Sequence, residues 1–344
     1  MPGFAYSLRT REAMPQPNIL TPEEKPDDQS FDIALRPTSL QEYVGQASVK
    51  ENLTIAIHAA RHRKEPLDHV LLHGSPGLGK TTLAHVISKE LKAQVRVTSG
   101  PALERAGDVA AILTNLGDGD VLFIDEIHRL PRTVEEILYP AMEEYAIDLI
   151  VGKGPAARTL RLDLPRFTLI GATTRLALLS SPLRDRFGLT YHLDYYSEAD
   201  ISSILERSAK LLKVPLEPAA RKLLAGRSRR TPRVANRLLK RVRDFATVRT
   251  GGTVDVPSTT AALEQLGIDQ LGLDPVDRRT LITIIDQFNG GPVGLSTLAA
   301  TTGEDVRTLE DVVEPFLLQA GLLVRTPRGR VATPVAYQHL QREA

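Results

Sequence analysis

Short apolar runs alternate with helical patterns from about residue 31 onward. The apolar runs predict buried strands, and the stretches between them show the spacing of amphipathic helices. The expected strands are residues 69–72, 94–98, 121–124 and 167–172, and the expected helices are residues 80–91, 102–116 and 134–145. Buried strands separated by helices are typical of a parallel sheet covered on both faces. The pattern therefore predicts an α/β fold with a doubly wound parallel sheet.

Two further apolar runs, residues 147–151 and 159–163, flank a turn rich in glycine and proline at residues 152–155. This arrangement predicts a β-hairpin inserted before the last strand of the sheet. Its apolar side chains favour the hypothesis that the hairpin binds a protein partner, and simple packing at a sheet edge is the alternative.

Beyond residue 197 the pattern becomes helical, and it ends in a different arrangement. Residues 197–268 predict a small helical domain. The last segment predicts helices at residues 278–288, 296–301 and 304–320, and then a hairpin with strands at 322–324 and 330–332. Pro315 lies inside the third helix and is expected to bend it. Three helices followed by a hairpin are typical of a winged-helix domain.

The expected domain boundaries follow these changes of pattern. They are a flexible tail at residues 1–30, the sheet domain at 31–196, the helical domain at 197–268 and the winged helix at 269–344.

Composition places the chain among ordinary globular proteins, with 42% hydrophobic and 25% charged residues. No apolar run approaches the ~20 residues that span a bilayer, and the first ten residues lack the core of a signal peptide. The absence of cysteine excludes disulfides and thiolate metal sites. These features predict a cytoplasmic protein without membrane contact.

Net charge does not indicate nucleic acid, because it is only +1. Eight of the 18 residues from 226 to 243 are Arg or Lys and none is acidic. Such a run is either a solvated face or a contact for an anion.

Residues 74–81, GSPGLGKT, fit the phosphate-binding loop G-x-x-x-x-G-K-[ST]. An expected strand precedes the loop and an expected helix follows it. Glycines such as Gly77 and Gly79 let backbone N–H groups point at phosphate oxygens, and Lys80 neutralises phosphate charge. Thr82 extends the helix N-terminus that faces the phosphates. The loop predicts a site for ATP or ADP.

Two carboxylates end the buried strand at residues 121–124. Asp125 would hold Mg²⁺ through water, with the Thr81 hydroxyl as a second ligand. Glu126 would polarise the water that attacks the γ-phosphate. Asp125 follows Lys80 by 45 residues with another strand between them, a spacing that resembles NTPases with a strand inserted between the two Walker motifs.

Three further features are candidates for completing this site. Thr173 and Thr174 end a buried strand, where they either position the water or cap a turn. Arg184 and Arg186 lie in residues 181–187, a helix start with Ser181 at the N-cap and proline at N1. One of these arginines is a candidate finger for a neighbouring subunit's γ-phosphate, and a solvated pair is the alternative.

Arg233 belongs to a second helix start of the same type, with Thr231 at the N-cap and proline at N1. A helix N-terminus attracts anions, so this arginine is expected to approach phosphate.

Several longer strings resemble the RuvB family and follow one another in the family's order. They are residues 74–82 (GSPGLGKTT), 122–129 (LFIDEIHR), 171–175 (GATTR), 181–188 (SPLRDRFG), 231–239 (TPRVANRLL), 290–295 (GGPVGL) and 325–330 (RTPRGR). The resemblance covers about residues 31–340 and is far more specific than the Walker motifs alone. It implies a bacterial AAA+ ATPase that encircles duplex DNA as a hexameric ring. It also implies recruitment to a four-way junction by RuvA, where the nuclease RuvC can join.

The resemblance also implies roles for individual residues. The implied nucleotide contacts are Leu35, Arg36, Gly77, Lys80, Thr81, Thr82, Tyr196 and Arg233, together with Glu143, Glu144 and Tyr145. Glu144 departs from the Asp that is usual in the family. Arg186 matches the arginine finger, and the inserted hairpin matches the element that docks on RuvA.

The terminal hairpin carries the implied DNA contact. Arg325 and Arg330 match the wing of the family, and Arg328 lies between them on a turn that also contains proline and glycine. We expect these three arginines to hold the DNA backbone and not to read bases, because a motor must move along any sequence. Val306 stands where the family has an arginine near the wing, although Arg307 lies next to it.

The expected function is therefore an ATP-driven DNA translocase that drives branch migration of Holliday junctions in recombination and repair. A clamp-loader-like ATPase would share the first two domains and lack a winged helix. A protein-remodelling ATPase would need a pore loop and no DNA-binding wing. A non-enzymatic nucleotide switch is disfavoured because Glu126 and both candidate arginine fingers are present.

Overall fold

A five-stranded parallel sheet forms the centre of the first unit, as the alternating pattern predicts. Its strands are β1 (Val70–His73), β2 (Val95–Ser99), β3 (Val121–Asp125), β6 (Thr168–Thr173) and β7 (Leu189–His192). They lie in the order β2-β3-β6-β1-β7. β7, which pairs with β1 at the edge, was not predicted, because its side chains alternate between half-buried and exposed.

The computed structural model describes residues 33–151 and 158–342. The predicted tail at residues 1–30 and the hairpin turn at residues 152–155 lie outside the described residues.

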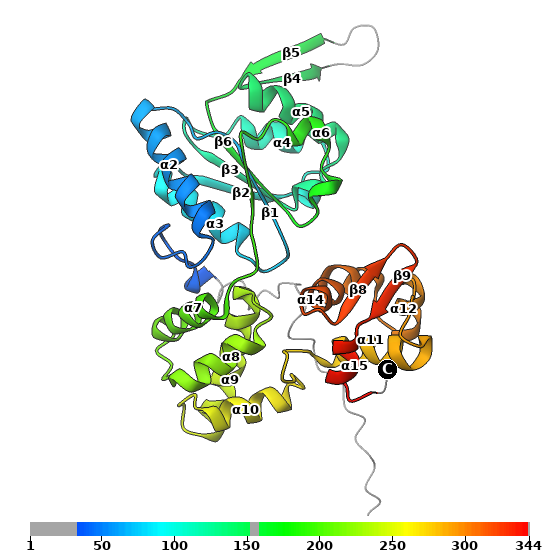
Figure 1. Ribbon diagram of the computed structural model, residues 1–344. Helices are drawn as coiled ribbons and strands as arrows, with labels where there is room; N and C mark the ends of the chain where they lie inside the picture. Colours follow the sequence, from blue (N-terminus) through cyan, green and yellow to red (C-terminus); the bar gives the residue numbers. More distant parts are fainter. Residues whose placement is uncertain (1–32, 152–157, 343–344) are drawn as a thin grey trace, which may run out of the picture.

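Helices cover both faces of the sheet (Figure 1). Along β3, Val121 and Phe123 belong to one core and Leu122 and Ile124 to the other, because successive side chains of a strand point to opposite faces. The covering helices are α2 (Ala47–Arg63) and α3 (Lys80–Leu91) in the first core, and α4 (Ala106–Leu113) and α5 (Arg132–Glu143) in the second. The doubly wound α/β fold is confirmed.

The predicted inserted hairpin is present as β4 (Ala146–Val151) and β5 (Arg158–Asp163), paired antiparallel. In Figure 1 it projects from the end of the sheet unit that lies farthest from the helical unit. Ile147 at its base is fully buried, whereas Leu160 further along β5 is 48% exposed. An exposed leucine on a projecting hairpin leaves apolar surface available to a partner.

Four helices form the second unit: α7 (Glu198–Leu211), α8 (Pro218–Arg227), α9 (Pro232–Arg249) and α10 (Val256–Gln265). The predicted helix faces are buried, with Leu205 on α7 and Leu238, Leu239 and Val242 on α9 fully enclosed. Their core is continuous with the α2–α3 side of the sheet unit. Among the described residues, no helix is both long and apolar enough to cross a bilayer.

The third unit has the helices and hairpin of a winged helix, as predicted. Its elements are α11 (Pro275–Ile282), α12 (Leu295–Thr302), α13 (Val306–Thr308), α14 (Glu314–Gln319), β8 (Leu323–Thr326), β9 (Gly329–Ala332) and α15 (Pro334–His339). The helix expected at residues 304–320 is irregular, with a π-helical turn at Leu309–Val313 between α13 and α14. Pro315 is the second residue after this turn. Because proline has no N–H and crowds the preceding turn, it explains the break in regular hydrogen bonding.

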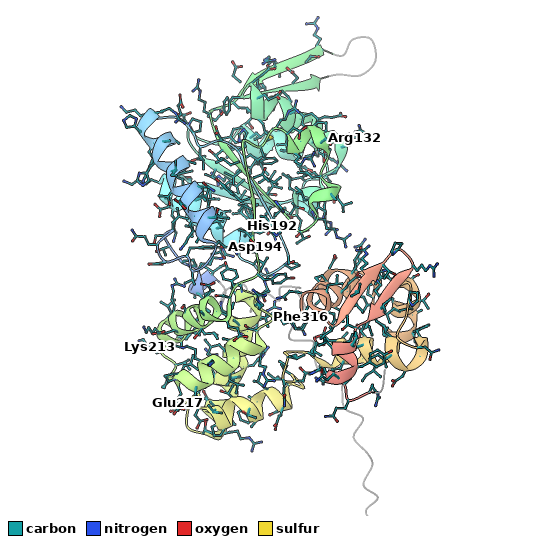
Figure 2. All side chains as sticks on the ribbon, in the orientation of Figure 1. Arg132, His192, Asp194, Lys213, Glu217 and Phe316 are labelled. Atoms are coloured by element: carbon teal, nitrogen blue, oxygen red, sulfur yellow. The ribbon has the colours of Figure 1, made fainter. Side chains whose placement is uncertain are left out.

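A buried charge cluster joins the helical unit to the winged helix. Arg229, in the loop before α9, is 6% exposed and its guanidinium lies 3.0 Å from a carboxylate oxygen of Asp274. The same guanidinium binds Asp277 and stacks 4.5 Å above the ring of Phe316. Figure 2 shows Phe316 on the side of the winged helix that faces the helical unit. Two carboxylates share one arginine here, and Asp277 is the more deeply buried of the two.

The burial of Asp277 predicts a pH effect on stability. Burial is the main cause that raises the pKa of Asp277 from 3.8 to about 7. Because the folded pKa is above the unfolded one, the stability that the proton contributes is present below about pH 4 and lost as the pH rises through about 7. We expect the melting temperature of Asp277→Asn, relative to the unmodified chain, to increase between pH 5 and pH 8. Asp286→Asn, at a half-exposed acid, is the control. If the difference in melting temperature between Asp277→Asn and the unmodified chain does not vary with pH, Asp277 does not have the raised pKa assigned to it.

Candidate active site

A cavity of about 330 Å³ lies where the sheet unit meets the helical unit, beside the carboxyl ends of β1 and β3. Ligands of open α/β sheets bind at this end of the strands. Twelve of the predicted site residues line it: Leu35, Arg36, Gly77, Gly79, Lys80, Thr81, Thr82, Asp125, Glu126, Thr174, Tyr196 and Arg233. The structure thus brings together residues that are almost 200 positions apart in the sequence.

The loop between β1 and α3 requires its glycines. Gly77 and Gly79 have φ values of +80° and +93°, which favour glycine. A Cβ on Gly77 would lie 3.1 Å from the Cβ of Arg233, and one on Gly79 would lie 3.0 Å from the Tyr43 hydroxyl. The tight turn and the close approach of the helical unit both depend on the missing side chains.

Lys80 is the first residue of α3 and is only 7% exposed. Its ammonium donates to the carbonyl oxygens of Gly74 and Ser75 at 2.8 and 3.0 Å. Burial lowers its pKa to about 8, and the charges of Asp125 and Glu126 oppose this shift. A buried ammonium held by its own loop is suited to neutralising phosphate oxygens.

Thr81 on α3 and Asp125 at the end of β3 fit a magnesium ion. The Thr81 hydroxyl donates to a carboxylate oxygen of Asp125 at 3.0 Å, which puts two oxygen ligands side by side at the cavity. Mg²⁺ prefers such oxygens and usually takes its remaining ligands from water and phosphate. No cluster of three or more His, Asp or Glu side chains suited to another metal occurs in the described residues.

Glu126 lies beside this pair in a left-handed backbone conformation with φ of +49°. Burial raises the pKa of its carboxyl, and the neighbouring charge of Asp125 raises it further. A raised pKa makes the carboxylate a stronger base, as general base catalysis requires.

The two candidate threonines occupy different surroundings. The Thr174 hydroxyl lies 3.4 Å from a carboxylate oxygen of Glu126 and lines the cavity. Thr173 is fully buried, and its hydroxyl lies 2.9 Å from Nδ1 of His128. Thr174 is therefore the threonine placed to meet a water in the cavity.

Four of the predicted nucleotide contacts do not line this cavity: Glu143, Glu144, Tyr145 and Arg186. The Arg186 guanidinium lies 3.2 Å from a carboxylate oxygen of Glu143 and 4.5 Å above the Tyr139 ring. Glu144 pairs with Arg161 on the hairpin. These residues form a separate surface next to the hairpin.

The local prediction around Arg186 was wrong in one respect. Helix α6 spans only Ser181–Arg184, and its N-cap is Ser180, whose side chain accepts from the N–H of Leu183. Ser181 is thus the first helical residue and Arg186 follows the helix. At the second helix start Thr231 is the N-cap as predicted, but its side chain makes no capping bond and lies near the Ser228 carbonyl.

The three wing arginines differ in exposure. Arg325 is 63% exposed and Arg328 is also exposed. Arg330 is 11% exposed and its guanidinium lies 2.8 Å from a carboxylate oxygen of the buried Glu314. Arg330 therefore stabilises the base of the wing in this structure.

The cavity lining also includes residues that were not predicted, among them Tyr43, Arg207 and Asp311. Tyr43 packs against the loop, Arg207 donates to the carbonyl oxygens of Leu35 and Arg36, and Asp311 comes from the winged helix. Arg175, which directly follows Thr174, binds Asp311 and Glu310. No sequence motif contains Asp311, because its position depends on how the third unit packs against the first.

Three family models together match almost all of the described chain. Residues 35–193 match the Holliday junction DNA helicase RuvB P-loop domain, residues 196–269 the RuvB AAA lid domain, and residues 270–341 the RuvB C-terminal winged helix domain. The chain belongs to the RuvB family.

Relatives support the assignment to the RuvB family along nearly their whole length. The Holliday junction branch migration complex subunit RuvB of Clostridium kluyveri is 57% identical over 324 residues, which cover 94% of this chain and 93% of that protein. The subunit of the same name from Chloroflexus aggregans is 60% identical over 322 residues, which cover 94% and 92%. The solved structure of the Thermotoga maritima RuvB Holliday junction branch migration motor is 52% identical, with a TM-score of 0.82 and coverage of 90% and 99%.

Proposed function

We propose that the chain is the ATP-hydrolysing subunit of a motor that drives branch migration of Holliday junctions in recombination and repair. The observation that carries this proposal is the nucleotide cavity, which combines the phosphate-binding loop, a candidate base and a residue of the winged helix. A DNA-binding unit in contact with the nucleotide site can respond to hydrolysis. We expect this motor to work in the cytoplasm.

Hydrolysis in this cavity rests on positioning and charge. Lys80 and the backbone N–H groups of the loop hold the phosphates, and Arg233 approaches them from the helical unit. Glu126 accepts a proton from the attacking water, which Thr174 helps to position. Bound Mg²⁺, held by Thr81 and Asp125, would neutralise charge that develops on the phosphate oxygens.

The surface around Arg186 supports assembly of neighbouring subunits, which the family resemblance implies form a hexameric ring. Arg186, Glu143, Glu144 and Tyr145 lie outside their own subunit's cavity, so they reach a nucleotide only if it belongs to a neighbour. In the ring, Arg186 stabilises the charge on the neighbour's γ-phosphate.

Each domain has its own part in this motor. The sheet domain at residues 31–196 holds the nucleotide, the lid at 197–268 moves with its hydrolysis, and the winged helix at 269–344 moves the DNA.

We expect the wing to bind duplex DNA and four-way junctions through phosphate contacts. Each such contact contributes about 0.9 to the slope of log affinity against log salt. Changing Arg325 and Arg328 to Ala should flatten that slope by up to ~2 per engaged subunit, equally on unrelated duplexes. We chose these two because both are exposed, whereas the Arg330 side chain is 11% exposed and is held by the buried Glu314 at 2.8 Å. Arg63→Ala, at an exposed arginine of α2, is the control. An unchanged slope in the wing variant would show that the wing does not contact the DNA backbone.

We expect the projecting hairpin to dock on RuvA, and RuvC to join in the resolving complex. Replacing the exposed Leu160 by Asp should abolish recruitment by RuvA and leave basal ATPase activity intact, because a charge in an apolar contact is costly. Thr159→Asp is the matched control, since it places the same charge on the opposite face of β5. Equal binding of RuvA by all three proteins would exclude this face of the hairpin.

Two alternative ATPase functions can be distinguished from the proposed one. A clamp-loader-like subunit has no role for the winged helix that the structure contains. A protein-remodelling ATPase would be stimulated by unfolded protein, whereas we expect stimulation by duplex DNA and junctions. Comparing ATPase rates with each of these additions separates the two activities.

A further inference from the structure

His128 lies directly behind the candidate base. It belongs to the short 3₁₀ turn Ile127–Arg129 after β3, and its side chain is 7% exposed. Its Nδ1 atom lies 2.9 Å from the Thr173 hydroxyl, and its Nε2 atom lies 3.4 Å from a carboxylate oxygen of Glu126. One buried ring therefore contacts both the catalytic carboxylate and strand β6.

The hydrogen bonds around Thr173 determine which ring nitrogen carries the proton. The backbone N–H of Arg175 donates to the Thr173 hydroxyl oxygen at 3.0 Å. The buried hydroxyl must place its own proton as well, and Nδ1 of His128 is the one acceptor that it contacts among the described residues, so Nδ1 accepts. A neutral imidazole with an accepting Nδ1 carries its proton on Nε2, the atom that faces Glu126.

The surroundings favour this neutral ring. Burial is the main cause that lowers the pKa of His128, and the charges of Arg175 and Arg129 lower it further. Asp311 and Asp125 act in the opposite direction, and the Glu126 carboxylate also faces the ring. The neutral ring can still donate one hydrogen bond to the carboxylate.

Among the described residues, the Glu126 carboxylate has few other groups to orient it. Its side chain is 35% exposed, and the Thr174 hydroxyl lies 3.4 Å from the same carboxylate oxygen. We propose that His128 is a positioning residue for hydrolysis: its Nε2–H holds the Glu126 carboxylate in the orientation that accepts the proton of the attacking water. Its Nδ1 ties this orientation to Thr173 on β6, the strand that leads to Thr174. This inference rests on the proposed role of Glu126 as the base.

His69 is the structural counterpart in the same unit. It is also 7% exposed, and its two nitrogens lie 3.0 Å from the Met142 carbonyl oxygen and 2.9 Å from the Leu169 amide nitrogen. Its partners are backbone groups, and neither His69 nor the two residues that provide them line the cavity. If His128 serves only packing, its replacement should affect the protein in the same way as the replacement of His69.

The test compares variants of His128 that keep one polar atom at a time. The amide of His128→Gln reaches toward the Nε2 position, that of His128→Asn reaches only the Nδ1 position, and His128→Leu keeps neither. We expect His128→Leu to lower the single-turnover rate of ATP hydrolysis about 10- to 100-fold, the loss typical when the partner that orients a metal-site ligand is removed. The affinity for ADP should stay within about twofold, because His128 does not line the cavity.

Recovery of the hydrolysis rate by polar variants of His128 separates a positioning role from a packing role. We expect His128→Gln to recover most of the rate and His128→Asn to recover little. In a Glu126→Gln background, His128→Leu should cause no further loss, because the two residues act as a unit. His69→Leu should lower the melting temperature and leave the rate of the folded protein unchanged.

Three results would overturn the proposal. They are equal rates for His128→Asn and His128→Gln, additive losses with Glu126→Gln, or a fall in rate that simply follows a fall in melting temperature. Substantial turnover by Glu126→Gln alone would instead contradict the proposed role of Glu126, so the two failures are distinguishable.

Discussion

Replacing Glu126 by Gln is expected to lower ATP hydrolysis by about 10²- to 10⁴-fold, the usual contribution of a positioned general base. The amide keeps the size of the carboxylate and cannot accept the proton. Binding of ATP should persist, since Lys80, Thr81 and the loop are unchanged. Phosphate release and direct nucleotide titration measure the two effects separately.

Lys80→Ala provides the contrast. It removes a buried ammonium from the phosphate site, so we expect affinity for ATP itself to fall. A Glu126→Gln protein that hydrolyses ATP within a fewfold of the normal rate would show that another group acts on the water.

Arg186→Ala should lower ATPase activity by roughly 10³- to 10⁵-fold, the range attributed to an arginine finger. Because we place this arginine at the neighbour's nucleotide, mixing inactive Arg186→Ala with inactive Lys80→Ala should restore part of the activity. In a mixed ring, the first protein offers an intact cavity and the second offers an intact finger.

The control for this mixture is a Lys80→Ala, Arg186→Ala double variant in place of the Lys80→Ala protein. It assembles with the same surfaces and has no finger to offer, so activity should stay absent. Lack of recovery in mixed rings whose co-assembly has been demonstrated would argue for a role within one subunit.

The fold was largely predictable because its strands are short, apolar and separated by clear helices. The buried runs that became β1, β3 and β6 sit in the centre of the sheet, where both faces are covered. The edge strand β7 escaped prediction because half of its side chains face solvent. The π-helical turn before Pro315 was predicted only as a bend, since the sequence does not specify how the lost hydrogen bond is replaced.

The site was predictable where local chemistry determines it. Gly77, Lys80 and Asp125 occupy motifs whose turn, helix start and strand end are encoded within a few residues. Asp311 could not be found in this way, because it reaches the cavity only through packing between units. His128 lies inside a motif that we had identified, but its role depends on the contact with Thr173, 45 positions away.

The central claim is that ATP hydrolysis by this chain moves a DNA junction. The most direct measurement is dissociation of a labelled four-way junction into two duplexes, with and without RuvA, ATP and Mg²⁺. We predict migration that requires ATP, depends on RuvA and is absent with Glu126→Gln. An intact junction, under conditions where the same protein binds it with RuvA and hydrolyses ATP, would contradict the account.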